Sequence, residues 1–263
     1  MPIWLYEIRP LYTAVVLIVL IETVSMIGLF LARRFVLPRF NYSEGINDAV
    51  SGTVQAIGVF YGITVGLIAV AVWDTNSKAT DLVTREASAI GGMYRDVQGF
   101  PAPLRDELSS LLRDYTTYII QQSWPAQKQG RTAEGGTEIM NQFQAKLFAY
   151  QPATPGQAQL YGEALRAFNN LTDARRLRLN AVRGGLSGTM WAVIWIGAVI
   201  SIGVAYLFNI QDAKMHALLI GLMAGFLSIV LFMIVINDKP FYGSVSVSPE
   251  PYQGLLDRLS TIK

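Results

Sequence analysis

The chain has 263 residues, of which 52% are hydrophobic and only 15% are charged. Soluble domains of this size usually carry more charge, so the composition indicates a membrane protein. A net charge of +2 argues against nucleic acid as a partner, because phosphate binding needs clustered Lys and Arg. The absence of cysteine excludes thiol chemistry, and a single histidine, His216, leaves little material for a metal site. We therefore expect no metal and no cofactor.

The first predicted element is a membrane-spanning helix over residues 11–32. A bilayer core of about 30 Å requires about 20 apolar residues in a helix, and this run provides them. Its single charged residue, Glu22, lies near the middle. Arg33 and Arg34 close the run, and a short polar connector follows over residues 35–47.

The second predicted span covers residues 49–73, carries no charge, and continues without a proline into an amphipathic pattern that ends near Val97. At about 100° per residue, two stripes lie on roughly opposite sides of this helix. A small-residue stripe is predicted to pack against another span, because such faces allow close approach in lipid; it contains Gly58, Gly62 and Gly66. The other stripe is the candidate pore lining and contains Thr53, Ile57, Phe60, Thr64, Leu67 and Ala71.

Residues 74–183 form a different kind of sequence, in which apolar residues recur at spacings of three and four. No alternating strand pattern is visible, so this region is predicted to be a helical domain outside the membrane. Its expected helices cover residues 82–97, 104–119, 139–147 and 160–182, with turns or loops at 99–103, 125–136 and 151–156.

Two further spans are predicted over residues 184–211 and 217–237, joined by a tight hairpin at Asp212 to Lys214. The predicted fold class is therefore all-α: four transmembrane helices in two hairpins with a helical extramembrane domain between them. The expected parts are a first hairpin over 1–73, the helical domain over 74–183, a second hairpin over 184–237 and a polar tail over 238–263.

The charges near the spans give conflicting indications of topology. Arg33, Arg34 and Arg39 place the first connector inside, whereas the basic residues from Arg175 to Arg183 place the helical domain inside. Long segments count little in the positive-inside rule, so the charges alone leave the topology open.

The candidate pore stripe would form an apolar constriction in an oligomer from Phe60 with Ile57 and Leu67, and Thr64 would add a hydroxyl ring. Such constrictions can gate by dewetting. The alternative is that both stripes are simply packed, since small-residue spacings are common in membrane helices.

Glu22 is a candidate for ion or proton traffic, because a carboxylate in mid-membrane costs several kcal/mol unless it is protonated, hydrated or paired. Gln55, Thr53 or another hydroxyl on the second span is the expected hydrogen-bond partner of its protonated form. A neutral structural glutamic acid is the alternative.

The remaining features point to no catalytic activity. His216 is expected to be solvated beside the last hairpin, and the basic residues from Arg175 to Arg183 are expected to contact headgroups or solvent. No phosphate-binding loop, HExxH or GxSxG motif is present, so the chain is not expected to be an enzyme.

Two short patches resemble the bestrophin family. The run from Val72 to Ser77, followed by Arg85-Glu86, is similar to the bestrophin junction between a span and a long helix. The run from Asp238 to Pro249, which contains Pro240-Phe241-Tyr242-Gly243, and the downstream Leu255-Leu256-Asp257 resemble the Pro-Phe-Gly segment and its continuation in the bacterial bestrophin-like branch. The order of spans, helical domain, spans and tail is also similar.

The resemblance implies a homo-oligomeric ion channel in a lipid bilayer, with a pentamer preferred and the second span lining the pore. It also implies that the protein lies in a bacterial inner membrane and that the helical domain is cytosolic. Asp74 and Asn76 become pore-mouth candidates. Asp74 stands where bestrophins have Arg, which would oppose anions near a pore. The acidic cluster that binds calcium in animal bestrophins has no match after Gly243, so no calcium site is expected.

Three functions are therefore compared. The first is an oligomeric channel with the second span as pore. The second is a proton-conducting complex that uses Glu22, and the third is a non-transporting scaffold or sensor whose helical domain binds a partner.

Overall fold

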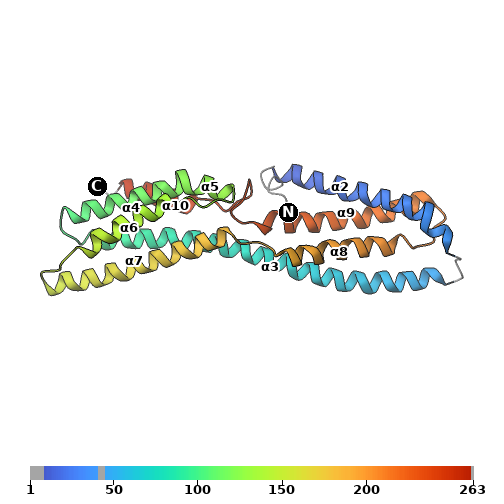
Figure 1. Ribbon diagram of the computed structural model, residues 1–263, viewed down its shortest axis with the longest axis horizontal. Helices are drawn as coiled ribbons and strands as arrows, with labels where there is room; N and C mark the ends of the chain where they lie inside the picture. The colour runs from blue at the N-terminus through green and yellow to red at the C-terminus, as the bar shows by residue number, and fades with distance from the viewer. Residues whose placement is uncertain (1–8, 41–44, 262–263) are drawn as a thin grey trace. The chain divides into compact units, whose positions relative to one another are not determined.

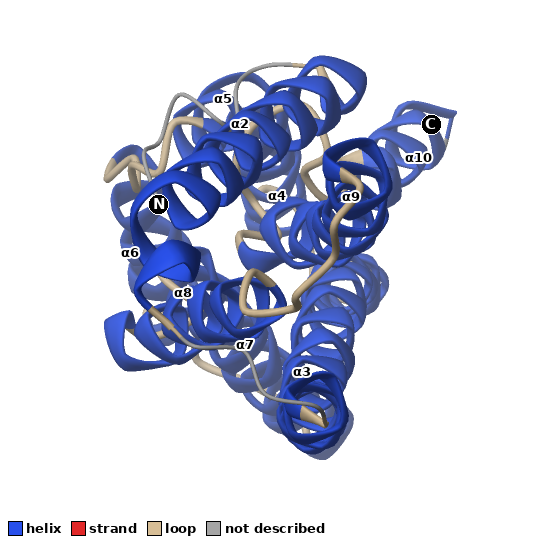
Figure 2. Ribbon diagram, turned by 90° about the vertical axis from the view of Figure 1, so that its right-hand side faces the viewer, coloured by secondary structure: helices blue, strands red, loops and turns tan. Residues whose placement is uncertain are grey.

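The computed structural model describes residues 9–40 and 45–261. Within this part of the chain every regular element is a helix, as Figure 2 shows, so the predicted all-α class is confirmed. The chain divides into two compact units. Unit 1 contains the residues up to Thr75 together with Gly185–Asp238, and unit 2 contains Asn76–Gly184 together with the residues from Lys239 onward.

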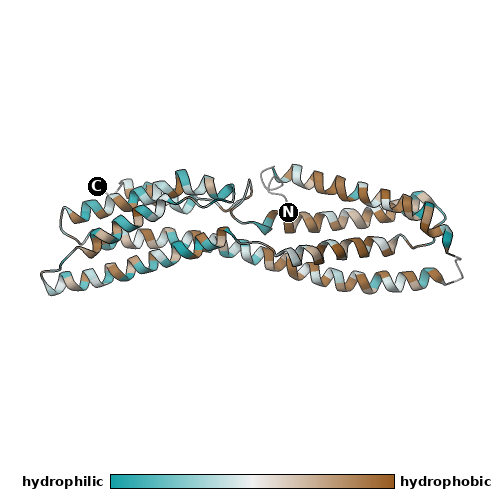
Figure 3. Ribbon diagram, viewed as in Figure 1, coloured by the Kyte–Doolittle hydropathy of each residue, from teal (hydrophilic) through white to brown (hydrophobic). Residues whose placement is uncertain are grey.

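Among the described residues four helices are long and apolar enough to cross a membrane, and they form unit 1 together, α3 with its first part only. Figure 1 labels them. They are α2 (Pro10–Leu31), α3 (Ile46–Val97), α8 (Gly188–Ala205) and α9 (Ala213–Asp238). Figure 3 shows apolar colouring along α2, α8, α9 and the first part of α3. A helix of this kind satisfies its backbone groups internally, which the bilayer core requires.

The helix ends in unit 1 differ in detail from the sequence prediction. After α2 the backbone stays helical through a π-turn, Ala32–Val36, and a 3₁₀ turn, Leu37–Arg39, so the connector begins later than expected. The third span is shorter than predicted, because α8 begins where Ser187 caps it, with its Oγ accepting from Met190 N at 3.2 Å, and it ends at Ala205. Residues 206–212 then form the non-helical link to α9.

Helix α3 contributes to both units. It is one α-helix of 52 residues without a break, as the lack of a proline between the second span and Val97 predicts. Its residues up to Thr75 belong to unit 1 and those from Asn76 belong to unit 2.

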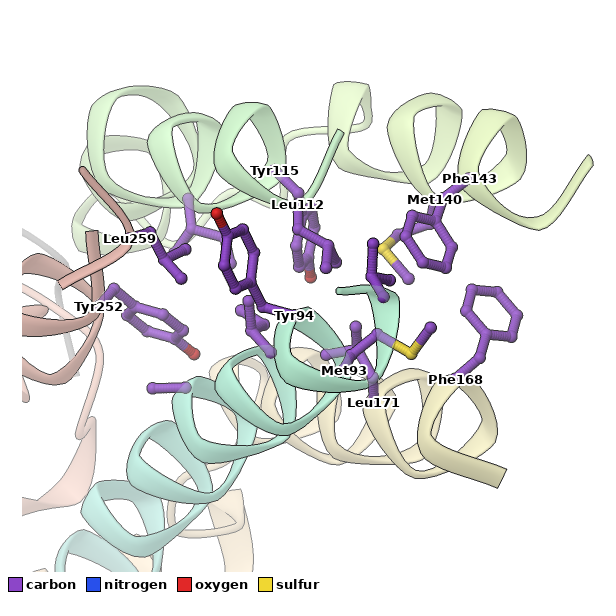
Figure 4. Close-up of a cluster of buried hydrophobic side chains, with 14 of the residues drawn as sticks. Met93, Tyr94, Leu112, Tyr115, Met140, Phe143, Phe168, Leu171, Tyr252 and Leu259 are labelled. Atoms are coloured by element: carbon purple, nitrogen blue, oxygen red, sulfur yellow. The ribbon is translucent and has the colours of Figure 1, made fainter. Parts of the chain in front are cut away.

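Unit 2 is a helical bundle with a hydrophobic core. Besides the end of α3 it contains α4 (Leu104–Tyr118), a π-turn (Ile119–Ser123), α5 (Trp124–Lys128), α6 (Gly135–Phe148), α7 (Pro155–Val182) and α10 (Glu250–Thr261). Figure 4 shows side chains from α3, α4, α6, α7 and α10 converging on this core. The amphipathic spacing in residues 82–182 therefore reflects one buried face on each helix.

Two segments of unit 2 differ from the prediction. The expected loop over residues 125–136 begins as helix, because α5 continues from α4 through the π-turn and buries Trp124 and Gln127. The polar tail is also not a separate part: it contains α10, whose Tyr252 and Leu259 are buried in the core of unit 2. The spacing of Tyr252, Leu255 and Leu259 is the helical signal for this packing.

Candidate functional site

In unit 1, α3 contacts the rest of its chain through one narrow face. Tyr61, Val65 and Val72 are its buried residues there. The Tyr61 hydroxyl donates to the Ile194 carbonyl oxygen of α8 at 2.9 Å. Gly197 of α8 makes room for this ring, since a Cβ atom at that position would lie in direct overlap with ring carbons of Tyr61. A single aromatic hydroxyl inside an uncharged span was the sequence signal for this contact.

This contact face lies between the two stripes predicted from the sequence. At about 100° per residue, Tyr61, Val65 and Val72 are roughly a quarter turn from Phe60 and Thr64 on one side and from the glycine stripe on the other. Only 11% of the most apolar window of α3 is buried in the chain, compared with 39% for α9. Most of the circumference of α3 is therefore left for lipid or for other protein.

The candidate pore residues form an open stripe along α3. Phe60 and Leu67 are 73% and 67% exposed, and the rest of the stripe is exposed or half-buried. The hydroxyls of Thr53 and Thr64 donate to carbonyl oxygens one turn earlier, those of Ala49 and Phe60, at 3.0 Å and 2.8 Å. These bonds satisfy each hydroxyl proton and leave oxygen lone pairs on the exposed face.

The glycine stripe does not pack against another span of its own chain. A Cβ atom built at Gly58, Gly62 or Gly66 meets no other described side chain or segment within 4 Å. The expectation that this face packs on a span is therefore wrong within one subunit, because the intrachain contact uses the neighbouring Tyr61 face instead. The stripe remains an open, narrow surface on which another helix could approach closely.

The two pore-mouth candidates lie on either side of the boundary between the units. Asp74 is exposed at the end of the unit 1 part of α3, and Asn76 is half-buried at the start of the unit 2 part. Thr75 between them donates its hydroxyl to the Ala71 carbonyl at 2.9 Å, which is a helical back-bond.

Glu22 faces α9 and not the second span. Its carboxyl oxygens lie beside Gly221 and Gly225, where built Cβ atoms would be 3.7 Å and 3.1 Å from them. The predicted partners are wrong: Gln55 donates to Ser51 Oγ at 3.1 Å, and Thr53 bonds to its own helix. Gly221 and Gly225, one turn apart on α9, create the space for the carboxyl group of Glu22. The contact between Glu22 and these glycines joins the two hairpins, and no local pattern in the sequence predicts it.

His216 is buried, with 1% of its surface exposed, and so is not the solvated residue that the sequence predicted. Arg33 Nη1 donates to His216 Nδ1 at 3.2 Å and to the Ile210 carbonyl at 2.9 Å. Since Nδ1 accepts, Nε2 carries the proton and faces the Ala205 carbonyl at 3.3 Å. Arg33 thus joins the end of α2 to the link between α8 and α9 and to the first turn of α9.

In unit 2 a polar cluster missed from the sequence is centred on Glu86, which is fully buried. Tyr115 and Tyr252 donate to its two carboxylate oxygens at 2.6 Å and 2.8 Å. Arg178 forms a short ion pair with the same carboxylate and is 1% exposed, so it does not belong to a headgroup-contacting cluster as predicted. The guanidinium carbon of Arg178 lies 6.0 Å from the ring centre of Trp124.

The electrostatics of this Glu86 cluster follow from burial. Burial raises the pKa of Tyr115 and of Tyr252, and the adjacent Glu86 carboxylate raises both further. For Arg178 burial acts to lower the pKa, but the Glu86 carboxylate and the phenol oxygens hold the pKa above its ordinary value. Arg178 therefore keeps its positive charge beside Glu86. The Glu86 cluster joins α3, α4, α7 and α10, because each of these helices contributes one of its four side chains.

The comparisons with known proteins agree with this architecture. Residues 19–252 match the family model for the bestrophin-like domain. Two crystal structures of variants of a bacterial bestrophin homologue from Klebsiella pneumoniae each superpose with a TM-score of 0.68 at 10% sequence identity, covering 94% of this chain and 98% of theirs. A crystal structure described as a membrane protein superposes with a TM-score of 0.66 at 12% identity, covering 92% of this chain and 94% of that one. No curated protein matches the sequence.

The fold thus defines an integral membrane protein of the all-α class, in which four helices of the described part are long and apolar enough to cross a bilayer. The chain belongs to the bestrophin-like family. The resemblance to the bestrophin-like family, stated from the runs Val72 to Ser77 and Asp238 to Pro249, is confirmed at the family level.

Proposed function

We propose that the chain is one subunit of an oligomeric ion channel whose pore is lined by α3. The observation that carries this proposal is the open pore stripe of α3 in a member of the bestrophin-like family. A helix that contacts its own chain through one narrow face can turn an opposite or adjacent face toward a central axis. One subunit alone encloses no such axis, so the proposal requires several copies.

The pore stripe sets the proposed mechanism of conduction. Rings of Ile57, Phe60 and Leu67 from neighbouring copies form an apolar constriction, and it gates by changes in wetting. Thr64 adds a ring of oxygen atoms between Phe60 and Leu67, where a dehydrating ion gains a polar contact. The glycine stripe receives a helix of a neighbouring copy, since a small-residue face permits close approach in lipid.

Two polar residues at one end of the pore stripe contribute to ion selection. Asp74 and Asn76 lie at the mouth, and a ring of Asp74 carboxylates raises the local cation concentration and opposes anions. We place unit 2 in the cytosol and the protein in a bacterial inner membrane, as the resemblance to bestrophins implies.

Planar-bilayer recording of purified protein tests this function. Phe60→Ala widens the narrowest apolar ring and is expected to raise conductance several-fold or to abolish closure. Val59→Ala is the matched control, because Val59 is also exposed, at 59%, but lies about 100° away from Phe60 around α3. Equal effects of the two substitutions on the current would overturn the assignment of the pore face.

The same recordings distinguish the channel from the two alternative functions, a scaffold or sensor and a proton-conducting complex. A scaffold or sensor gives no current in any variant. A proton-conducting complex gives a current whose reversal potential follows the pH gradient and which is lost in Glu22→Gln. The proposed channel gives a current that follows the gradient of another ion and that responds to Phe60.

A further inference from the structure

The cleft beside Glu22 is a second feature of unit 1, independent of α3. It has a volume of about 650 Å³ and lies along α9 between Ala217 and Ile229. Apart from Glu22 every residue that lines it is apolar or glycine. Leu222, Phe226 and Ile229 on its wall are 59–68% exposed, so the cleft is bordered by side chains that face the acyl chains of a bilayer.

The carboxyl group of Glu22 is placed to be the polar end of this cleft. Glu22 lies near the middle of α2, and its two oxygens are directed at the notch made by Gly221 and Gly225. Within the described residues the carboxyl group makes no hydrogen bond and no ion pair, and the nearest arginine of its hairpin, Arg33, is committed to His216 and to backbone carbonyls. A membrane-embedded carboxyl without a partner is costly and marks a site of function by default.

The volume of the cleft and its lining residues indicate which class of ligand fits it. Its volume lies in the range of sites that bind drug-sized molecules, about 300–1,000 Å³, and is far larger than a proton or a metal ion needs. Apolar walls fit an alkyl chain, and a single carboxyl group at one end fits a group that donates hydrogen bonds to it. An amine meets this requirement best, because transfer of the carboxyl proton to the nitrogen forms a charge-assisted pair with no net charge.

We propose that Glu22 and the glycine notch of α9 form a membrane-facing binding site for single-chain amphiphiles with a primary amine head group. The amine donates to the Glu22 carboxylate, and the alkyl chain lies along the α9 face near Leu222 and Phe226. A fatty acid cannot accept the Glu22 proton to form a pair of opposite charges, and a fatty alcohol provides only one hydrogen-bond donor.

Protection from a hydrophobic carbodiimide tests this site without requiring ion conduction. Dicyclohexylcarbodiimide takes the proton of a carboxylic acid on nitrogen while the carboxyl oxygen bonds to its central carbon, and the product rearranges to a stable N-acylurea. Protein in nanodiscs is expected to acquire one adduct at Glu22, located by peptide mass spectrometry, and Glu22→Gln removes it. Dodecylamine is expected to suppress the N-acylurea at Glu22 at a concentration about tenfold or more below that of dodecanol, because hydrogen bonds to a charged group are stronger than those between neutral groups. A dodecylamide at Glu22, formed when the bound amine attacks the O-acylisourea and releases dicyclohexylurea, also counts as occupancy of the site.

A matched pair of glycine variants tests the notch. Gly225→Leu fills the space beside the carboxyl group and is expected to abolish protection by dodecylamine, whereas Gly203→Leu on α8, where a Cβ atom has no contact within 4 Å, is expected to retain it. Equal protection by dodecylamine, dodecanol and dodecanoate, or no protection by the amine, would overturn the proposal. The result is independent of whether Phe60 controls a current, so failure here and failure of the channel function are distinguishable.

Discussion

The two units of this chain satisfy their polar and apolar groups in different ways. In unit 2 the charged residues Glu86 and Arg178 are buried with phenol partners, and helices from distant parts of the sequence close around them. In unit 1 the long helix α3 remains exposed over most of its surface, and its threonine hydroxyls bond to their own backbone. Unit 2 thus has an enclosed polar cluster inside its core, whereas unit 1 presents apolar surface that is available to a bilayer or to another copy.

The difference between the units indicates that sites of assembly and conduction lie in unit 1. A polar cluster that is fully enclosed contributes to the folding of unit 2 and has no route to an ion. An exposed helix that carries a glycine stripe, an apolar stripe and regularly spaced threonines has surface available for assembly and conduction.

The largest effect is expected from Arg178→Ala. Removing the guanidinium leaves the Glu86 carboxylate buried without a counter-charge, which costs about 3–5 kcal/mol in comparable buried pairs. Urea unfolding in detergent micelles measures the loss. Arg176→Ala is the matched control, because Arg176 is exposed on the same helix, and its effect should remain within about 0.5 kcal/mol. A small loss for Arg178→Ala would show that the cluster does not hold unit 2 together.

A smaller effect is expected from Gly197→Ala in unit 1. The added methyl group overlaps the ring of Tyr61 and must push α3 away from α8, at a cost of about 1–3 kcal/mol for overpacking. Gly203→Ala on the same helix adds a methyl group into open space and serves as the control. Thermal unfolding of the two variants in the same detergent compares them. Equal midpoints would contradict the contact between Tyr61 and α8.

A weaker effect concerns the pH dependence of unit 2. The pKa values of Tyr115 and Tyr252 are raised in the folded state, so their stabilising contribution is present below the unfolded phenol pKa of about 10 and is lost as the pH rises through the folded values. Tyr252→Phe is expected to cost about 1 kcal/mol at neutral pH and to flatten the decline above pH about 10. Tyr161→Phe, outside the Glu86 cluster, is the control. An unchanged alkaline slope in Tyr252→Phe would contradict the raised pKa.

The sequence predicted the features that depend on local composition and periodicity. The apolar runs, the unbroken helix from the second span to Val97 and the family resemblance all follow from residues that are close together in the chain. The contacts of Glu22 with Gly225, of Arg33 with His216, and of Glu86 with Arg178 join residues far apart in sequence. Their pairing depends on how the helices pack, and one sequence carries no local signal for it.

The glycine stripe shows a different kind of limit. Its periodicity predicts a face on which a helix can pack, but periodicity cannot say whether the partner lies in the same chain. Tyr61 decides this, because its ring and hydroxyl reach α8 and fix the intrachain face a quarter turn away. The pore stripe and the pore-mouth residues stay predictions for the same reason, since their role depends on neighbouring copies.

Cysteine accessibility along α3 tests the central claim most directly. The chain has no native cysteine, so single substitutions from residue 57 to residue 67 report one position each. In conducting protein we predict that a water-soluble cationic methanethiosulfonate modifies Ile57→Cys, Phe60→Cys, Thr64→Cys and Leu67→Cys and reduces the current, while Val59→Cys, Gly62→Cys and Ile63→Cys stay unmodified. Modification without helical periodicity, or modification centred on the glycine stripe, would contradict the proposal that this face of α3 lines a pore.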